Sequence, residues 1–141
     1  MRRGSPMRRT PLKSRRTQTG PPQDVVDAVY ERAMFSCERD GRAVGPRRGI
    51  DHHLHHRRPR AMGGTDRPDT NLPSNLLLLC PPCHEAIESR RGEALAAGWL
   101  VPQNGDPEET AVVLFGDRIR YLTATCEYSP HPPRWKEGEA P

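Results

Sequence analysis

The 141-residue chain is poor in side chains that build a core, because 33% of its residues are hydrophobic and 5% are aromatic. Together with 16 prolines and 12 glycines, this composition excludes one large hydrophobic core and predicts a small ordered centre between disordered ends. No apolar run is long enough to cross a bilayer or to act as a secretion signal, so we expect a cytoplasmic protein without membrane contacts.

The positive charge is concentrated in two segments. The net charge is +4, but residues 1–20 carry seven of the 22 lysines and arginines and none of the 18 acidic residues. A second cluster of eight arginines extends from Arg39 to Arg67. Such segments neutralise phosphates and bind nucleic acid, although the first could instead be a solvated tail. The side chains that we expect to bind phosphates are Arg57, Arg58, Arg60, Arg8, Arg9, Lys13, Arg15 and Arg16.

Hydrophobic spacing predicts two helices. Apolar residues recur at helical intervals from Val25 to Ala33, which indicates an amphipathic helix over 23–35. The second helix is expected to begin near Pro82, because proline is favoured at the first helical position, and to end near Ala97.

Two hairpins and a loop are predicted around these helices. Residues 42–56 are expected to form a hairpin with an irregular tip, followed by a loop over 57–74. Residues 111–122 have the pattern of a second hairpin with a two-residue glycine-aspartate turn, and the chain from about Ser129 is expected to be disordered.

The four cysteines favour metal binding over disulfides, because a chain expected in the cytoplasm is in a reducing compartment. Cys80 and Cys83 have the two-residue spacing of a zinc knuckle, and Cys37 with Asp40 could supply the other pair of ligands. The pattern predicts a structural Zn²⁺ site, which would stabilise a weak core. Cys126 as a substitute ligand and buried free thiols are the alternatives.

Five of the six histidines lie between residues 52 and 84, which marks this region as the candidate site. His55 and His56 are adjacent, so on a strand their side chains would point to opposite faces and could take different tasks. One could bind a metal and the other could activate a nucleophile. His84 and Glu88 are one helical turn apart and could reach the metal that His55 binds.

Two stretches of this region resemble the signature of the HNH endonuclease family. Residues 55–64 (HHRRPRAMGG) and residues 75–84 (NLLLLCPPCH) have its order and spacing, and the resemblance covers residues 37–91. The short basic chain is especially similar to phage-type HNH proteins. One departure is Asp40, which stands where the family usually has a second cysteine.

The resemblance implies an α+β fold: a small ββα-metal, or His-Me finger, domain with a treble-clef-like frame, an N-terminal helix, a C-terminal β-hairpin and disordered termini. It implies that His56 is the general base and that Asn75 orders the loop and orients this base. By the same resemblance, His55 and His84 bind the catalytic ion. Glu88 is a further candidate ligand.

The implied reaction is hydrolysis of DNA phosphodiester bonds with one divalent ion, which could be Mg²⁺, Mn²⁺, Ni²⁺ or Zn²⁺. Double-stranded DNA is the expected partner, and a homodimer or phage terminase and packaging proteins are further candidates. The alternatives are a catalytically silent zinc-finger DNA-binding module and a phage packaging accessory protein. The implied division is a basic arm at 1–22, the nuclease domain at 23–100, a hairpin extension at 101–128 and a tail at 129–141.

Overall fold

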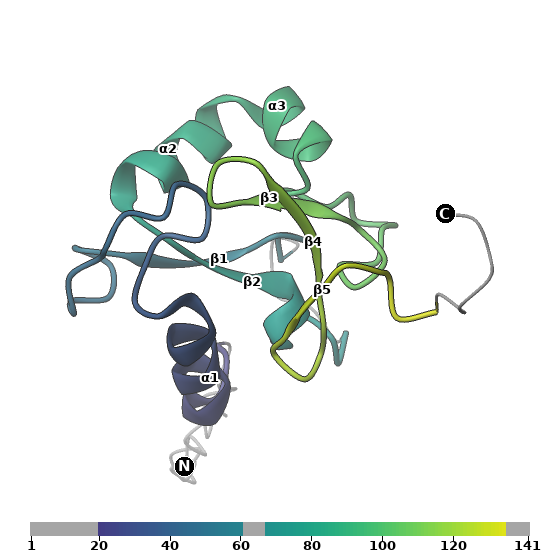
Figure 1. Cartoon of the computed structure of the whole chain (residues 1–141), viewed down its shortest axis with the longest axis horizontal. Helices are drawn as coiled ribbons and strands as arrows, with labels where there is room; N and C mark the ends of the chain where they lie inside the picture. Colours follow the sequence, from purple (N-terminus) through teal and green to yellow (C-terminus); the bar gives the residue numbers. More distant parts are fainter. Residues whose placement is uncertain (1–19, 61–66, 135–141) are drawn as a thin grey trace, which may run out of the picture.

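The computed structural model describes residues 20–60 and 67–134, and these residues form an α+β structure with two small antiparallel sheets (Figure 1). The predicted fold class is confirmed. No helix in the described ranges is long and apolar enough to cross a membrane. In chain order the elements are α1 (Gln23–Ala33), β1 (His53–His56), a 3₁₀ turn (Pro73–Asn75), β2 (Leu76–Leu79), α2 (Pro81–Ser89), α3 (Arg91–Ala96), β3 (Val112–Leu114), β4 (Arg118–Leu122) and β5 (Tyr128–Ser129).

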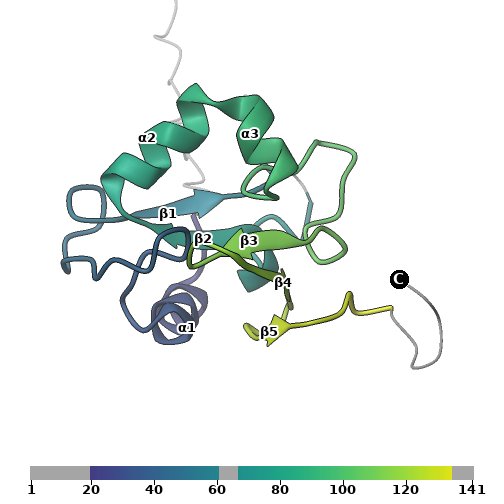
Figure 2. The same ribbon diagram turned by 45° about the horizontal axis from the view of Figure 1, so that its top comes forward.

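Strand β2 lies at the centre of the structure, between α1 on one side and α2 with α3 on the other (Figure 2). All four of its leucines are fully buried. Because side chains alternate along a strand, Leu76 and Leu78 pack with Val29 and Ala33 of α1. The other two leucines pack in the second cluster of the core. A strand buried on both faces explains the uninterrupted apolar run in the sequence.

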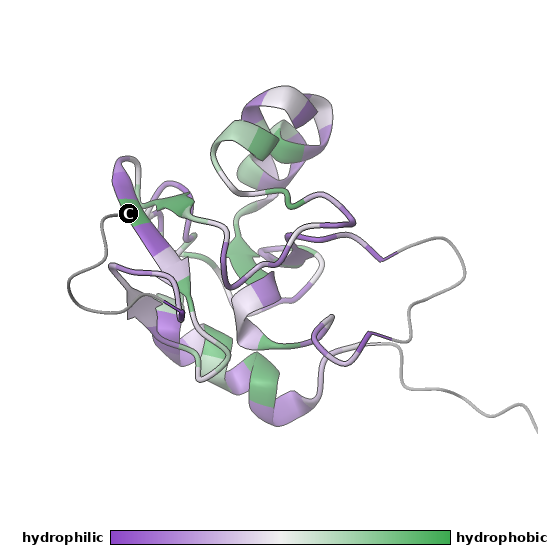
Figure 3. Ribbon diagram, turned by 90° about the vertical axis from the view of Figure 1, so that its right-hand side faces the viewer, coloured by the Kyte–Doolittle hydropathy of each residue, from purple (hydrophilic) through white to green (hydrophobic). Residues whose placement is uncertain are grey.

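Helix α1 is amphipathic, and hydrophilic and hydrophobic residues alternate along it at the bottom of Figure 3. Val26, Val29 and Ala33 are its buried residues. The helix ends before Met34 and Phe35, which have φ angles of 51° and 50°. Two residues in the left-handed region cannot continue a right-handed helix, so the helix is two residues shorter than predicted.

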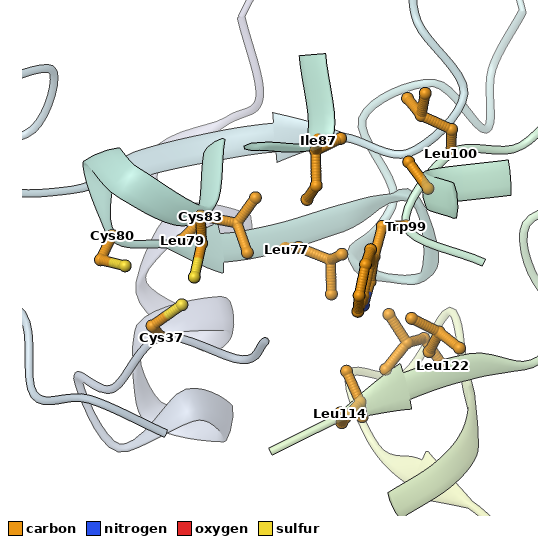
Figure 4. Close-up of a cluster of buried hydrophobic side chains, with 12 residues drawn as sticks. Cys37, Leu77, Leu79, Cys80, Cys83, Ile87, Trp99, Leu100, Leu114 and Leu122 are labelled. Atoms are coloured by element: carbon orange, nitrogen blue, oxygen red, sulfur yellow. The ribbon is translucent and has the colours of Figure 1, made fainter. Parts of the chain in front are cut away.

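The C-terminal strands share a core with the region that contains the histidines and cysteines. Trp99 packs in one cluster with Leu77 and Ile87 on one side and Leu114 and Leu122 on the other (Figure 4). The indole N–H of Trp99 donates to the carbonyl oxygen of Val113 (2.7 Å), which satisfies the polar atom of this buried ring. Residues after 100 therefore stabilise the same core as β2.

Three predicted elements differ from the structure. Residues 42–56 do not form a regular hairpin: beyond β1 this segment has only isolated bridges, such as Arg48 with His52. The helix predicted from Pro82 is interrupted at Arg90, whose φ and ψ of −122° and 64° are not helical. The turn between β3 and β4 contains three residues, because Leu114 pairs with Arg118.

Strand β5 adds a third strand beside β4, and it begins just before the predicted tail at Ser129. The predicted phosphate-binding residues of the arm and the loop glycines of the HNH signature lie outside the described residues. These are Arg8, Arg9, Lys13, Arg15, Arg16, Gly63 and Gly64.

Candidate active site

Strand β1 presents His55 and His56 to a cavity of about 530 Å³. Its antiparallel register pairs His55 with Leu77 and His56 with Leu76, so the two histidines start on opposite faces of the strand as predicted. Both nevertheless line the cavity, and among the described strands β1 pairs with β2 alone. The lining residues are Leu54, His55, His56, Pro59, Arg60, His84, Glu88, Arg91 and Leu100.

His55 is buried at the base of this cavity, with 7% of its surface exposed. Its Nε2–H donates to the carbonyl oxygen of Trp99 (2.9 Å), because a carbonyl can only accept. This bond leaves Nδ1 with its lone pair. Burial lowers the pKa of His55 to about 4, so the ring is neutral at pH 7 and has the form that binds metals.

His84 lies in the first turn of α2 and faces the same cavity. Its ring stacks on His53 with a centroid distance of 4.5 Å and lies 5.6 Å from the ring of His55. Its Nε2 is 3.5 Å from Oε1 of Glu88, one helical turn further on. The fold thus brings together His55, His84 and Glu88, a set of nitrogen and oxygen donors that suits a divalent ion.

His56 contacts a residue that the sequence did not single out. Its Nε2 is 3.0 Å from Oδ1 of Asn71, which also accepts a hydrogen bond from Arg60 (2.8 Å). Burial lowers the pKa of His56 below its usual value, and the nearby charges of Arg60 and Arg48 lower it further. The imidazole is therefore unprotonated at neutral pH and can accept a proton.

Asn75 is fully buried and its side chain binds the backbone of the long loop between β1 and β2. Oδ1 accepts from the backbone N–H of Arg58 (2.7 Å), and Nδ2 donates to the carbonyl oxygens of Thr70 (2.9 Å) and Arg58 (3.3 Å). These bonds join the two ends of the loop beside the histidines. The ring of His56 is instead hydrogen-bonded to the side chain of Asn71.

Arg57, a predicted phosphate ligand, lies inside the protein in this structure. Its side chain is fully buried, and its guanidinium donates to the carbonyl oxygens of four residues at 2.8–3.0 Å. It therefore joins the end of β1 to the following chain from inside the protein. The four acceptors belong to Ser74, Gly98, Pro107 and Thr110.

Arg58 is also buried, and its guanidinium binds Asp69 and the carbonyl oxygen of Gly105. Like Arg57, Arg58 therefore has internal hydrogen-bond partners, and its predicted contact with phosphate stays a prediction. Of the three arginines that follow the histidine pair, only Arg60 lines the cavity. Burial depends on which carbonyls surround each guanidinium, and a cluster of arginines in a sequence does not reveal this.

A second candidate metal site lies at the start of α2. Donor atoms of Cys37, Asp40, Cys80 and Cys83 all lie within 4.8 Å of one another, and Figure 4 shows the three sulfur atoms turned toward a common point. Asp40 Oδ2 is 3.2 Å from Cys83 Sγ and 3.7 Å from Cys80 Sγ. Cys126 packs in the other core cluster, so Asp40 is the fourth member of the group.

Three thiols and one carboxylate are a donor set that fits a structural zinc ion. Burial is the main cause that raises the pKa values of these thiols. It raises the pKa of Cys37 to about 11. Zinc binding would exchange their protons for the metal and thereby stabilise the fold. Arg39 donates to Cys83 Sγ (3.4 Å) and would offset part of the negative charge of such a site.

Sequence reasoning missed two polar residues of the cavity region. Asn71 lies in a turn before the 3₁₀ segment, where an asparagine is unremarkable, so its contact with His56 left no signal. Arg91 is the first residue of α3, after the break at Arg90, and it lines the cavity. Helical spacing from His84 could not have identified it, because the helix does not continue through Arg90.

The structure has the parts of a ββα-metal domain. Two antiparallel strands are followed by a helix, a cysteine cluster lies at the helix start, and histidines lie on the strand and on the helix. A family model described as HNH endonuclease matches residues 36–90. These residues therefore form an HNH endonuclease domain, as the resemblance implied. The comparisons with curated proteins and with solved structures gave no match.

Proposed function

We propose that this protein is a metal-dependent endonuclease that hydrolyses phosphodiester bonds of DNA, with His56 as the general base. The observation that carries the proposal is the meeting of His55, His56 and His84 in one open cavity. A module that only binds DNA needs no neutral, partly buried imidazole beside a group of candidate metal ligands. The match of residues 36–90 to the HNH family supports the same class of reaction.

The side chains divide the chemical work between them. The unprotonated ring of His56 takes a proton from the attacking water, which general-base catalysis requires near neutral pH. His55 and His84, with Glu88 as a further candidate, would hold the divalent ion. When bound, this ion supplies Lewis-acid stabilisation of the phosphate charge and of the departing 3′-oxygen. Asn75 fixes the loop that follows His56 through its bonds to Arg58 and Thr70.

The cavity offers its own phosphate-binding groups in place of Arg57 and Arg58. Arg60 and Arg91 line the cavity, from the loop after β1 and from the start of α3. Arg48 lies close enough to His56 to lower the pKa of this histidine. These guanidinium groups would hold the phosphates that flank the scissile bond.

The proposal is tested by incubating supercoiled plasmid with the full chain and Mg²⁺, Mn²⁺, Ni²⁺ or Zn²⁺, and with EDTA. The wild type is expected to nick or linearise the plasmid only with metal. His56→Ala is expected to lower the rate at least about 10³-fold with DNA affinity retained, because it removes the base and no phosphate ligand. His131→Ala, which changes a histidine outside the cavity, serves as the matched control.

Two results would contradict the proposal. A folded wild-type protein that binds DNA but does not cut it with any of the four ions would identify a DNA-binding module. Cutting by His56→Ala at the wild-type rate would exclude His56 as the base and would leave the class of enzyme intact.

A further inference from the structure

The amide of Asn71 makes three hydrogen bonds that connect the proposed base to the rest of the domain. Its Oδ1 lies 3.0 Å from Nε2 of His56 and 2.8 Å from Nη2 of Arg60. Its Nδ2 donates to the carbonyl oxygen of Gly20 at 3.3 Å. One side chain therefore contacts the imidazole, a cavity arginine and the segment that precedes α1.

The contacts with Arg60 and Gly20 fix the direction in which this amide points. A guanidinium can only donate, so the atom of Asn71 that faces Arg60 must be the oxygen. The carbonyl of Gly20 can only accept, so the atom that faces it must be the nitrogen. These two constraints are independent of the histidine and agree with each other.

The orientation of the amide determines the tautomer of His56. Because Oδ1 of Asn71 can only accept, Nε2 of His56 must carry the hydrogen of the neutral ring. Nδ1 is then the nitrogen with the free lone pair. A ring in the other tautomer would place the lone pair of Nε2 against Oδ1 and lose the hydrogen bond.

We infer that Asn71 is a positioning residue that holds His56 in the tautomer with Nδ1 free to accept the proton of the attacking water, and that Arg60 fixes Asn71 for this task. This inference rests on the proposed role of His56 as the base. It separates two tasks in the loop: Asn75 binds loop backbone, whereas Asn71 binds the imidazole. A histidine in the wrong tautomer cannot act as the base, so the effect should appear in turnover.

The first test is nitrogen NMR of the full chain labelled with ¹⁵N-histidine, at a pH where His56 is neutral. The wild type is expected to show His56 with a protonated Nε2 and an unprotonated Nδ1. Asn71→Leu is expected to show a mixture of both tautomers, whereas Asn71→Asp keeps an acceptor oxygen and is expected to retain the wild-type tautomer. Asn104→Leu, on an exposed loop, is the matched control.

The second test is plasmid cleavage by the same variants. Asn71→Leu is expected to lower kcat on the order of 10- to 100-fold with little change in KM, and Asn71→Asp is expected to restore most of the loss. Thermal unfolding of each variant separates a local effect from a loss of fold. An unchanged His56 tautomer in folded Asn71→Leu would overturn the inference. So would a predominant Nδ1–H tautomer in the wild type.

The NMR result is independent of whether the protein cuts DNA. If the wild type shows the expected tautomer, Asn71→Leu loses it and no variant cuts, the proposed function fails while the contact of Asn71 with His56 stands. If the wild type cuts DNA and Asn71→Leu cuts equally fast with the same tautomer, the proposed function stands and the role of Asn71 fails.

Discussion

Two adjacent residues of α2 enter two different sites, and the contrast between these sites separates structure from chemistry. Cys83 is buried in a group whose four donor atoms lie within 4.8 Å of one another. His84 faces an open cavity of about 530 Å³ with His55 and Glu88. Among the described residues, the donor atoms of the cysteine group lie close enough together to surround one ion, whereas those of the histidines are not gathered in this way.

This difference corresponds to the two kinds of protein metal site. A structural ion is enclosed by four protein ligands, whereas a catalytic ion keeps positions open for water and substrate. The cysteine group has the full number of ligands for the first kind. The histidine cavity has fewer gathered donors and room for a phosphate, as the second kind requires. Loss of the first site should therefore lower stability, and loss of the second should lower activity.

The largest effect is expected from Cys80→Ser. Removal of one ligand from the closed group should lower the free energy of unfolding by more than about 4 kcal/mol, because zinc binding and folding are coupled. Urea denaturation and the zinc content of the purified protein measure this change. Cys126→Ser, outside the group, should keep both values. Equal zinc content and equal denaturation midpoints for Cys80→Ser and the wild type would break the distinction between the two sites.

His84→Ala applies the same test to the open cavity. We expect the cleavage rate to fall about 10³-fold, or roughly 4 kcal/mol of transition-state stabilisation, because a ligand of the catalytic ion is lost. The free energy of unfolding should change by less than about 1 kcal/mol, since His84 lies outside the core clusters. Titration calorimetry with Mn²⁺ should show weaker binding for this variant than for Glu85→Ala on an exposed position of the same helix.

The sequence predicted which side chains come together better than it predicted their surroundings. Spacing alone placed Cys80 with Cys83 and His84 with Glu88, because both pairs lie within one helical turn or a knuckle. The position of Arg57 depends on carbonyls more than 40 residues away in the sequence, such as that of Gly98. No local pattern encodes such a contact.

The contact of Asn71 with His56 depends in the same way on how the loop closes between β1 and β2. The break in the second helix is a third case. Arg90 leaves the helical region although the surrounding residues 82–97 predict one helix, and Ile87 and Ala94 on either side of the break then pack in one cluster. Tertiary packing overrides local propensity here.

Arg57→Met and Arg60→Met form a matched pair that sharpens the contrast on a smaller scale. Arg57→Met should lower the free energy of unfolding by about 3 kcal/mol, because it leaves buried carbonyl oxygens without their donor. Arg60→Met should change stability by less than about 1 kcal/mol but weaken DNA binding and reduce its salt slope by about one. Binding isotherms at several salt concentrations and urea denaturation measure both effects. If Arg57→Met instead weakened DNA binding and Arg60→Met lowered stability, Arg57 would be the phosphate ligand.

The smallest effect is expected from Asp40→Cys, which restores the fourth thiolate of the cysteine group. Zinc favours thiolate over carboxylate in structural sites, so zinc affinity should increase on the order of tenfold, about 1.4 kcal/mol. Competition with a chromophoric chelator measures this change. Plasmid cleavage should stay at the wild-type rate, because Asp40 belongs to the closed group and not to the cavity. A gain in affinity accompanied by loss of cleavage would mean that the two sites are coupled through α2, on which Cys83 and His84 are neighbours.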